Sequence, residues 1–229
     1  AVVPHAFPAA AEWPALIDQA RHLEPDWSRW QTSGAARRAA LVIEGVAQGD
    51  PHPRIAVVTL ADANRLDHLT HQVNLLATGV HHITVALADA DRIASAVPQS
   101  DVVKLEAPGR NLAAARNLAA RTAIDRGADV IIFLDADCVA SGELVAQYVR
   151  ALECRPDAVV AGPVTYLGEG ELRTVRPKPH PARPNPPRGE LEPAGDYNLF
   201  WSLSFALTAT TWRRIDREFG GFDEGFVGY

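Results

Sequence analysis

Short apolar runs alternate with longer amphipathic segments from residue 54 onward. The short runs are typical of buried strands and lie at residues 55–60, 83–87, 101–105, 131–134 and 158–162. Between them the spacing of apolar residues predicts helices at residues 67–77, 91–96, 110–126 and 141–152. Strands that are separated by helices pair in parallel, so the pattern predicts an α/β fold with a mostly parallel sheet flanked by helices.

The first 53 residues follow a different pattern. Residues 9–20 and 35–47 indicate two helices, and Gly and Pro residues at 49–53 interrupt the chain after them. We therefore predict a helical N-terminal extension over residues 1–53 and an α/β domain over residues 54–229. The two helices pack either on the domain or on a second subunit, and the second arrangement would give a homodimer.

A proline-rich segment at residues 176–188 cannot belong to a central strand. We interpret it as a long loop beside the active site, with a polyproline ligand for a partner domain as the alternative. Its cationic side chains either approach phosphates or an anionic acceptor, or keep the loop soluble; they are Arg176, Lys178, Arg183 and Arg188.

The apolar run at residues 131–134 ends in two carboxylates, Asp135 and Asp137. In a strand the side chains alternate, so both carboxylates should point the same way at the carboxyl end of the strand. Taken alone, an Asp-x-Asp triplet is most often a solvated turn. The Ala-rich helix before it, which Gly127 ends, favours a site for a hard divalent cation that also contacts a phosphate-bearing ligand.

These motifs occur in an order that resembles the family 2 glycosyltransferases of the GT-A fold. In that family an Ala-Arg-Asn helix, here Ala115-Arg116-Asn117, precedes a Phe-Leu-Asp-x-Asp strand, here Phe133 to Asp137. The acceptor-side segments of the family resemble residues 197–207, 212–215 and 220–226. The resemblance extends from about Arg54 to Tyr229.

The resemblance implies an enzyme that moves a sugar from a nucleotide-diphosphate donor to an acceptor, with inversion and with Mn²⁺ or Mg²⁺ assistance. It assigns Asp137 as the direct metal ligand and turns Asp135 toward the ribose and the metal-bound waters. The acceptor is left open as a glycan, a lipid or a small molecule. Two alternatives remain: a nucleotide-sugar-binding module without efficient catalysis, and a sugar-phosphate nucleotidyltransferase, which usually has a Gly-rich basic loop that is missing after the first strand here.

Donor contacts are expected where the first strands end, because an open parallel sheet leaves a crevice there. The candidates for donor binding, besides Asp135, are Thr59, Asp62, Asp89, Arg110 and Asn117. Arg110 opens the Ala-rich helix and would clamp the diphosphate. For the Ala-Arg-Asn motif a structural alternative is that Arg116 pairs with an acid and Asn117 fixes a loop. The family's usual Pro-x-Tyr-Asn turn and second acidic pair are absent here, which leaves the nucleobase open.

On the acceptor side, Trp201 either stacks on a sugar ring or belongs to the core. The resemblance places the general base in a Gly-Glu-Asp motif shortly after the Gly-Gly-Phe-Asp segment. The sequence ends at Tyr229, where that motif should begin, so we expect the base just beyond Tyr229. Asp223 and Glu224 are weaker candidates for it.

Composition narrows the functional classes. A net charge of -6 over 229 residues argues against a nucleic-acid binder. The sequence contains no apolar stretch of about 18 residues and no signal-peptide pattern, so we expect a cytoplasmic protein, free or peripheral to the membrane. The two cysteines, Cys138 and Cys154, are expected to be reduced. Frequent Ala and Arg suggest a bacterial source.

Overall fold

The computed structural model describes residues 53–76, 79–107, 109–165, 180–182, 186–187, 189–194 and 196–226. Contacts between residues divide the chain into two compact units, 1–52 and 53–229. The predicted helical extension and the cationic residues of the proline-rich segment lie outside the described residues. The following description concerns the second unit.

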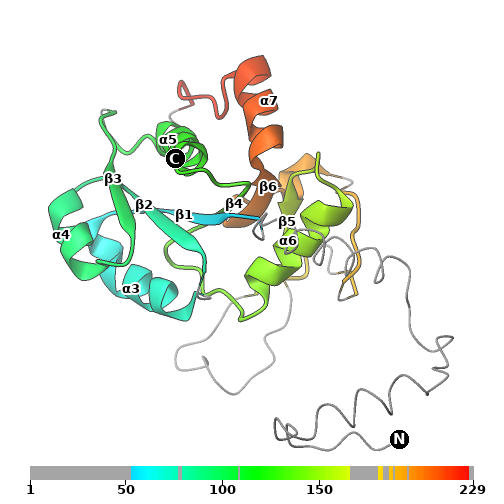
Figure 1. The fold of residues 1–229 in the computed structure, drawn as a ribbon, viewed down its shortest axis with the longest axis horizontal. Helices are drawn as coiled ribbons and strands as arrows, with labels where there is room; N and C mark the ends of the chain where they lie inside the picture. The colour runs from blue at the N-terminus through cyan, green and yellow to red at the C-terminus, as the bar shows by residue number, and fades with distance from the viewer. Residues whose placement is uncertain are drawn as a thin grey trace, which may run out of the picture. The chain divides into compact units, whose positions relative to one another are not determined.

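The described part of this unit contains one six-stranded sheet with the order β3-β2-β1-β4-β6-β5 (Figure 1). The strands are β1 (Ile55–Ala61), β2 (His81–Ala86), β3 (Asp101–Lys104), β4 (Val130–Leu134), β5 (Val160–Ala161) and β6 (Ser204–Thr208). The α-helices are α3 (Leu66–Leu75), α4 (Ala90–Ala96), α5 (Leu112–Asp125), α6 (Leu144–Cys154) and α7 (Ala209–Phe219). Two short 3-10 helices are η3 (Ala63–Arg65) and η4 (Tyr197–Leu199).

Four neighbouring strands form the parallel part of the sheet. β1 pairs in parallel with β2 on one side and with β4 on the other, and β3 adds in parallel to β2. The remaining two strands reverse direction in turn, because β6 is antiparallel to β4 and β5 is antiparallel to β6. The predicted α/β class with a mostly parallel, helix-flanked sheet is therefore confirmed. β6 was not among the predicted strands.

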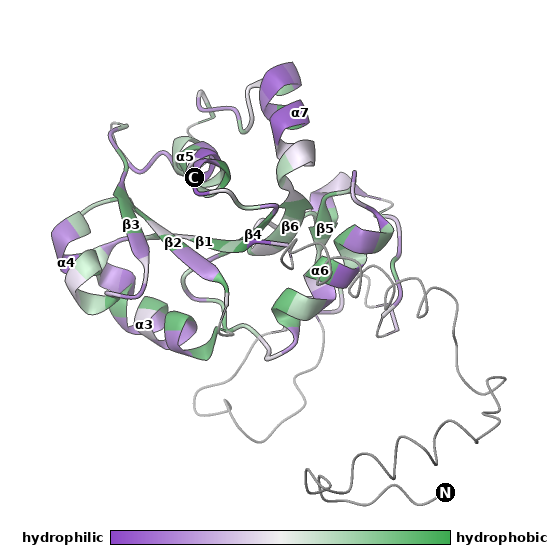
Figure 2. Cartoon of the chain, viewed as in Figure 1, coloured by the Kyte–Doolittle hydropathy of each residue, from purple (hydrophilic) through white to green (hydrophobic). Residues whose placement is uncertain are grey.

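Helices cover both faces of the sheet. Figure 1 shows α5 and α7 on one side and α3, α4 and α6 on the other. Alternate residues of β1 divide between these faces: Ala56 and Val58 pack with α5, while Val57 packs with α6. On the α5 side, Phe133 of β4 stacks on Phe205 of β6 with ring centroids 4.4 Å apart. Figure 2 shows the strands as mainly hydrophobic and the end of α7 as hydrophilic.

The start of α6 differs from the prediction. The helix begins at Leu144 rather than at Ser141, and its N-cap residue, Glu143, makes no capping bond with its side chain. Instead, the Leu144 N–H donates to the Ser141 carbonyl at 3.0 Å, so the predicted first turn of the helix is a separate turn. Among the described residues, no helix is both long and apolar enough to cross a membrane.

Candidate functional site

A cleft of about 180 Å³ opens at the carboxyl ends of β1, β2 and β4. This is the edge at which the parallel strands of an open sheet leave a crevice. Acidic, cationic and apolar side chains line the cleft together: Leu60, Ala61, Asp62, Arg65, Leu87, Leu112, Arg116, Asp135, Ala136 and Asp137. The structure thus brings the Asp-x-Asp residues together with the loop that follows β1 and the start of α5.

The two Asp-x-Asp carboxylates belong to a turn and not to a strand. β4 ends at Leu134, and the Cys138 N–H donates to the Asp135 carbonyl at 2.9 Å, which closes a turn over residues 135–138. The Asp135 N–H donates to the Leu203 carbonyl at 2.9 Å and ties the start of the turn to the chain just before β6. Our argument from strand alternation therefore fails, although Asp135 and Asp137 do line the same cleft.

Each carboxylate of the cleft faces an arginine. Arg116 approaches Asp135 at 3.7 Å, Arg65 approaches Asp137 at 3.3 Å, and Arg110 forms an ion pair with Asp62. Arg65, Arg110 and Asp137 are largely exposed, so their ion pairs add little stability and can exchange for other partners.

Burial dominates the electrostatics around Asp135. It raises the pKa of the Asp135 carboxyl to about 6, Arg116 opposes that rise, and Asp137 adds to it. Burial also lowers the pKa of the Arg116 guanidinium, against the effect of Asp135. Because a buried charge lacks the stabilisation that water gives, an additional positive charge near Asp135 and Asp137 would be favoured.

The acidic residues of the turn fit a divalent cation that takes its other ligands from elsewhere. Among the described residues no group of three or more His, Cys, Asp or Glu side chains could hold a metal ion. Mg²⁺ commonly uses one or two carboxylates and completes its coordination with waters and phosphate oxygens of the substrate. Asp135 and Asp137 supply that number of carboxylates, so the site suits a cation that arrives with a phosphate-bearing ligand.

The candidate donor residues after β1 and β2 have different positions. Asp62 lines the cleft, and its carboxylate accepts the Asn64 N–H at 2.9 Å. Thr59 does not line it: its side chain is fully buried on the α3 side of the sheet, where the hydroxyl donates to Gln72 at 2.8 Å. Thr59 lies within β1, whereas Asp62 follows the end of the strand and begins the loop that borders the cleft. Thr59 is therefore not brought together with Asp62 at the cleft.

Asp89 is exposed in the turn before α4, where it adopts a left-handed backbone with φ 54°. Asp89 is not among the residues that line the cleft. From the loop after β2, Leu87 lines it.

Asn117 is fully buried below the segment that follows α7. Its side-chain amide accepts the Phe222 N–H at 2.8 Å and donates to the Phe222 carbonyl and to the Glu224 carboxylate at 2.9 Å and 2.8 Å. These contacts correspond to the structural alternative for Asn117, that it fixes a loop. Asn117 is also absent from the lining of the cleft.

Arg116 connects the cleft to the acceptor-side segments. Besides facing Asp135, it donates to the Ser202 hydroxyl at 2.9 Å and lies over the Phe222 ring at 5.6 Å from the centroid. The structural alternative for Arg116, that it pairs with an acid, agrees with its approach to Asp135. A guanidinium held in this way links the Asp-x-Asp turn to two segments that are distant in sequence.

The acceptor candidates lie apart from the cleft lining. Trp201 is half-buried, and its ring packs edge-on against the His180 ring, with the ring centroids 4.8 Å apart. Asp223 and Glu224 are exposed; the Asp223 carboxylate accepts the Gly225 N–H at 2.9 Å, and the Glu224 carboxylate accepts from Asn117.

Sequence reasoning missed Arg65 and the three leucines of the cleft. Arg65 lies three residues after Asp62, in the loop that follows the carboxyl end of β1. A cation at that position could have been recognised as a candidate for the site. Leu60, Leu87 and Leu112 gave no comparable signal, because apolar residues at the ends of strands and helices usually belong to the core.

Comparison with known proteins gives one family. The model described as glycosyl transferase family 2 matches residues 84–214, from within β2 to within α7. The solved structures that are similar to part of this chain include the following two, and the chain spans about a third of the length of the first and a quarter of the length of the second. The crystal structure of S. aureus TarS 1–349 has a TM-score of 0.37 and 17% identity over 44% of this chain and 32% of that chain. The apo-form glycosyltransferase GlyE of Streptococcus pneumoniae TIGR4 has a TM-score of 0.31 and 15% identity over 41% and 25%. None of the curated proteins matches.

Proposed function

Because the chain belongs to glycosyl transferase family 2, we propose that its cleft binds a nucleotide-diphosphate sugar and that the domain transfers the sugar to an acceptor hydroxyl. The observation that carries the proposal is the turn at residues 135–138, which directs two carboxylates into a cleft that arginines also line.

The cleft offers a separate environment to each part of such a donor. Leu60, Leu87 and Leu112 provide apolar surface for a nucleobase. The buried carboxylate of Asp62 can accept hydrogen bonds from a base or a ribose. Arg65 and Arg110 are exposed and can exchange their carboxylate partners for a diphosphate, to which guanidinium groups bind in a bidentate manner.

Asp137, with Asp135 beside it, would hold Mn²⁺ or Mg²⁺ together with the phosphates of the donor. A cation there neutralises negative charge on the leaving diphosphate. Asp137 is the more exposed of the two carboxylates, with 45% of its side chain accessible against 30% for Asp135, so we assign it the direct contact. Arg116 stays with Asp135, since its other contacts to Ser202 and Phe222 hold it in place.

The proposed reaction breaks the bond between the anomeric carbon and the diphosphate oxygen, and that oxygen keeps the electron pair. The acceptor oxygen attacks from the opposite face, which inverts the configuration, and a general base takes its proton. We assign no base among the described residues. Asp223 and Glu224 are not among the residues that line the cleft, and both carboxylates accept hydrogen bonds, from the Gly225 N–H and from the Asn117 side chain.

Thermal unfolding with a panel of nucleoside diphosphates, with and without Mn²⁺, tests the proposal. We expect one nucleotide to raise the melting temperature only with Mn²⁺; at about 100 times its Kd, stabilisation should reach about 2.7 kcal/mol. Asp137→Asn should abolish the shift. Glu153→Gln, which changes an exposed carboxylate on α6, should keep it.

The result would contradict the proposal if no nucleotide stabilised the protein, or if Asp137→Asn responded like the wild type. If one nucleotide does stabilise the wild type, hydrolysis of the corresponding nucleotide sugar separates an enzyme from a binding module. Turnover supports an enzyme, and binding without turnover supports the alternative of a nucleotide-sugar-binding module.

A further inference from the structure

A buried glutamine of α3 forms hydrogen bonds with the backbone of the Asp-x-Asp turn. Gln72 of α3 is 1% exposed. Its side-chain nitrogen donates to the Asp135 carbonyl at 2.6 Å and to the Cys138 carbonyl at 3.0 Å. Asp135 and Cys138 are the first and last residues of the turn, so a single amide group binds both of its ends. Both hydrogens of that amide are used in these bonds.

The other end of the Gln72 amide is also bonded. Its oxygen accepts the hydroxyl hydrogen of Thr59 at 2.8 Å. Because Thr59 has no second hydrogen to give, its oxygen must accept from the His82 ring, whose Nε2 lies 3.2 Å away. The contact therefore requires a proton on the Nε2 of His82, and in the neutral ring this leaves Nδ1 as an acceptor.

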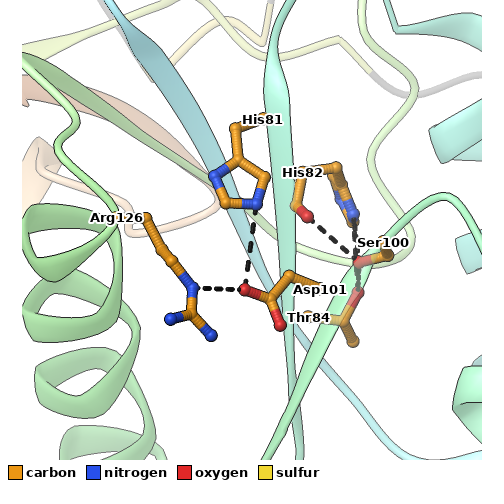
Figure 3. Close-up of polar contacts among 6 residues, drawn as sticks. All are labelled: His81, His82, Thr84, Ser100, Asp101 and Arg126. Atoms are coloured by element: carbon orange, nitrogen blue, oxygen red, sulfur yellow. Dashed lines mark hydrogen bonds and ion pairs between the residues drawn. The ribbon is translucent and has the colours of Figure 1, made fainter.

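The row of hydrogen bonds continues to the far side of His82. With Nε2 protonated, the His82 Nδ1 accepts the Ser100 hydroxyl at 2.7 Å (Figure 3). Ser100 in turn accepts the Thr84 hydroxyl at 2.8 Å. Donation therefore runs in one direction, from Thr84 through Ser100, His82, Thr59 and Gln72 to the two turn carbonyls. Figure 3 shows His81 on the opposite side of β2, where it faces Asp101 and Arg126, so it is not part of this row.

Burial makes this arrangement specific. Thr59, Thr84, Gln72 and His82 are at most 4% exposed, and buried polar groups cost free energy unless they are hydrogen-bonded. The Gln72 amide is bonded through its oxygen and through both hydrogens of its nitrogen, so its position is fixed. A fixed amide that binds two carbonyls of a turn also fixes the peptide planes of that turn.

Among the described residues, the turn has two further backbone bonds, from the Cys138 N–H to the Asp135 carbonyl and from the Asp135 N–H to the Leu203 carbonyl. Its carboxylates also form ion pairs with Arg116 and Arg65. Without the donors of Gln72, the Cys138 carbonyl would lose its bond and the Asp135 carbonyl one of two. Rotation of the turn toward water would restore bonding and would redirect Asp137, its third residue. A carboxylate displaced by about 1 Å binds a ligand much less well.

We propose that Gln72 is a positioning residue: by binding the Asp135 and Cys138 carbonyls, it holds the two Asp-x-Asp carboxylates in the geometry that binds a cation and a nucleoside diphosphate. The ligand part of this inference rests on the proposed function. The control of the turn by Gln72 does not.

The reactivity of Cys138 measures the turn directly. In a Cys154→Ser background Cys138 is the only cysteine, and it is half-buried in the turn. Gln72→Met removes both donors while keeping the side-chain length. We expect a neutral disulfide reagent to label the Cys138 thiol about 10-fold faster in this variant at a temperature well below unfolding, which corresponds to about 1.4 kcal/mol of easier opening.

Val85→Ala is the matched control. Val85 of β2 is fully buried and loses packing when shortened, but it belongs to the cluster on the α5 side of the sheet, which contains no residue of the turn. In this variant Cys138 should react at the wild-type rate even if the global stability falls. Titration calorimetry with Mn²⁺ and the nucleoside diphosphate that stabilises the wild type adds a second readout. Affinity should fall about 10-fold in Gln72→Met and stay unchanged in Val85→Ala.

Equal labelling rates and equal affinities in Gln72→Met and the wild type would overturn the inference. If Gln72→Met does not fold, Thr59→Val replaces it: Gln72 stays but loses its fixed orientation, and labelling should rise about 3-fold. A wild-type rate in that variant would overturn the inference equally. If labelling rises as expected while the wild type binds no nucleotide, the turn control stands and the proposed function fails.

Discussion

Gly221 lies where any side chain would strike Asn117. A Cβ atom at this position would collide with the Asn117 side-chain oxygen, and the backbone has φ +82°. The missing side chain lets the Asn117 amide approach closely enough to bind the Phe222 backbone through both its oxygen and its nitrogen. The neighbouring Gly220 has a similar φ of +78° but open space around it, because it only ends α7.

This pair of glycines separates backbone strain from collision. Gly220→Ala should destabilise the protein by about 1 to 2 kcal/mol, the usual cost of a left-handed non-glycine residue. Gly221→Ala should cost about 2 kcal/mol more, because it also breaks the bonds between Asn117 and Phe222. Urea unfolding of both variants gives the comparison. Equal losses would mean that Asn117 moves aside at little cost.

At the residue scale, sequence reasoning worked where local pattern and chemistry agreed. Asp135 and Asp137 follow a four-residue apolar run, and Asp62 follows the first strand, so their place at one edge of the sheet was predictable. Thr59 was not, because a residue inside a strand can face either side and only the packing of α3 decides it. Asn117 carried a family motif whose physical role depends on a segment about 100 residues away.

At the element scale, α5 depends on small side chains. Ala115, Ala119 and Ala123 are fully buried against the sheet, together with residues of β1 and β2. Small residues on this face let the helix lie close to the strands and place Arg116 beside Asp135. The Ala-rich sequence therefore suits close packing as well as helix formation.

Enlarging that face should be costly. Ala119→Leu inserts extra atoms into a filled interface and should lower the free energy of unfolding by about 1 to 3 kcal/mol. Ala113→Leu, at a half-buried position of the same helix, should change it by less than about 0.5 kcal/mol. Chemical denaturation of both variants checks this. If both lose stability equally, the α5 interface has room to spare.

The predictability of elements followed their regularity. For β1 to β4 and the helices between them, short apolar runs alternate clearly with amphipathic segments, so the order of these elements was predictable. β6 escaped because Ser204–Thr208 lies in a longer apolar and aromatic stretch, in which a short run does not distinguish a strand from core packing. The start of α6 was placed too early because Ser141 resembles a capping residue, but its hydroxyl does not cap the helix observed.

At the scale of the whole domain, the reversal at β6 brings the segments on either side of β6 and α7 to the edge of the sheet that holds the cleft. Leu134, at the carboxyl end of β4, pairs with Ser204, and Val130 pairs with Thr208, so β6 runs back toward the opposite edge. The chain then returns along α7. After Gly221 it meets the start of α5, where the Asn111 side chain donates to the Glu224 carbonyl at 2.9 Å. One antiparallel strand therefore places two distant parts of the sequence around the cleft.

The stability of the whole domain should depend on pH through His82. Burial, with a smaller effect from His81, lowers the pKa of His82 to about 4, whereas an unfolded histidine has a pKa of about 6.5. Well above pH 6.5, His82 is neutral in both the folded and the unfolded state, so its contribution to the free energy of unfolding is fully present. As the pH falls toward 4 the unfolded state gains a proton that the folded state refuses, so up to about 3 kcal/mol of stability is lost over this range.

Urea unfolding at several pH values between 7.5 and 4.5 would measure this loss. Other groups also titrate, and the raised pKa of Asp135 acts with the opposite sign, so the informative quantity is the difference between the wild type and His82→Gln. His82→Gln should remove the part of the slope that His82 causes, while His81→Gln, on the exposed side of β2, should keep most of it. Parallel pH profiles for the wild type and His82→Gln would show that His82 accepts its proton without opening the fold. The hydrogen bonds from Ser100 to Gln72 would then tolerate a charged ring, against the donor direction inferred from their geometry.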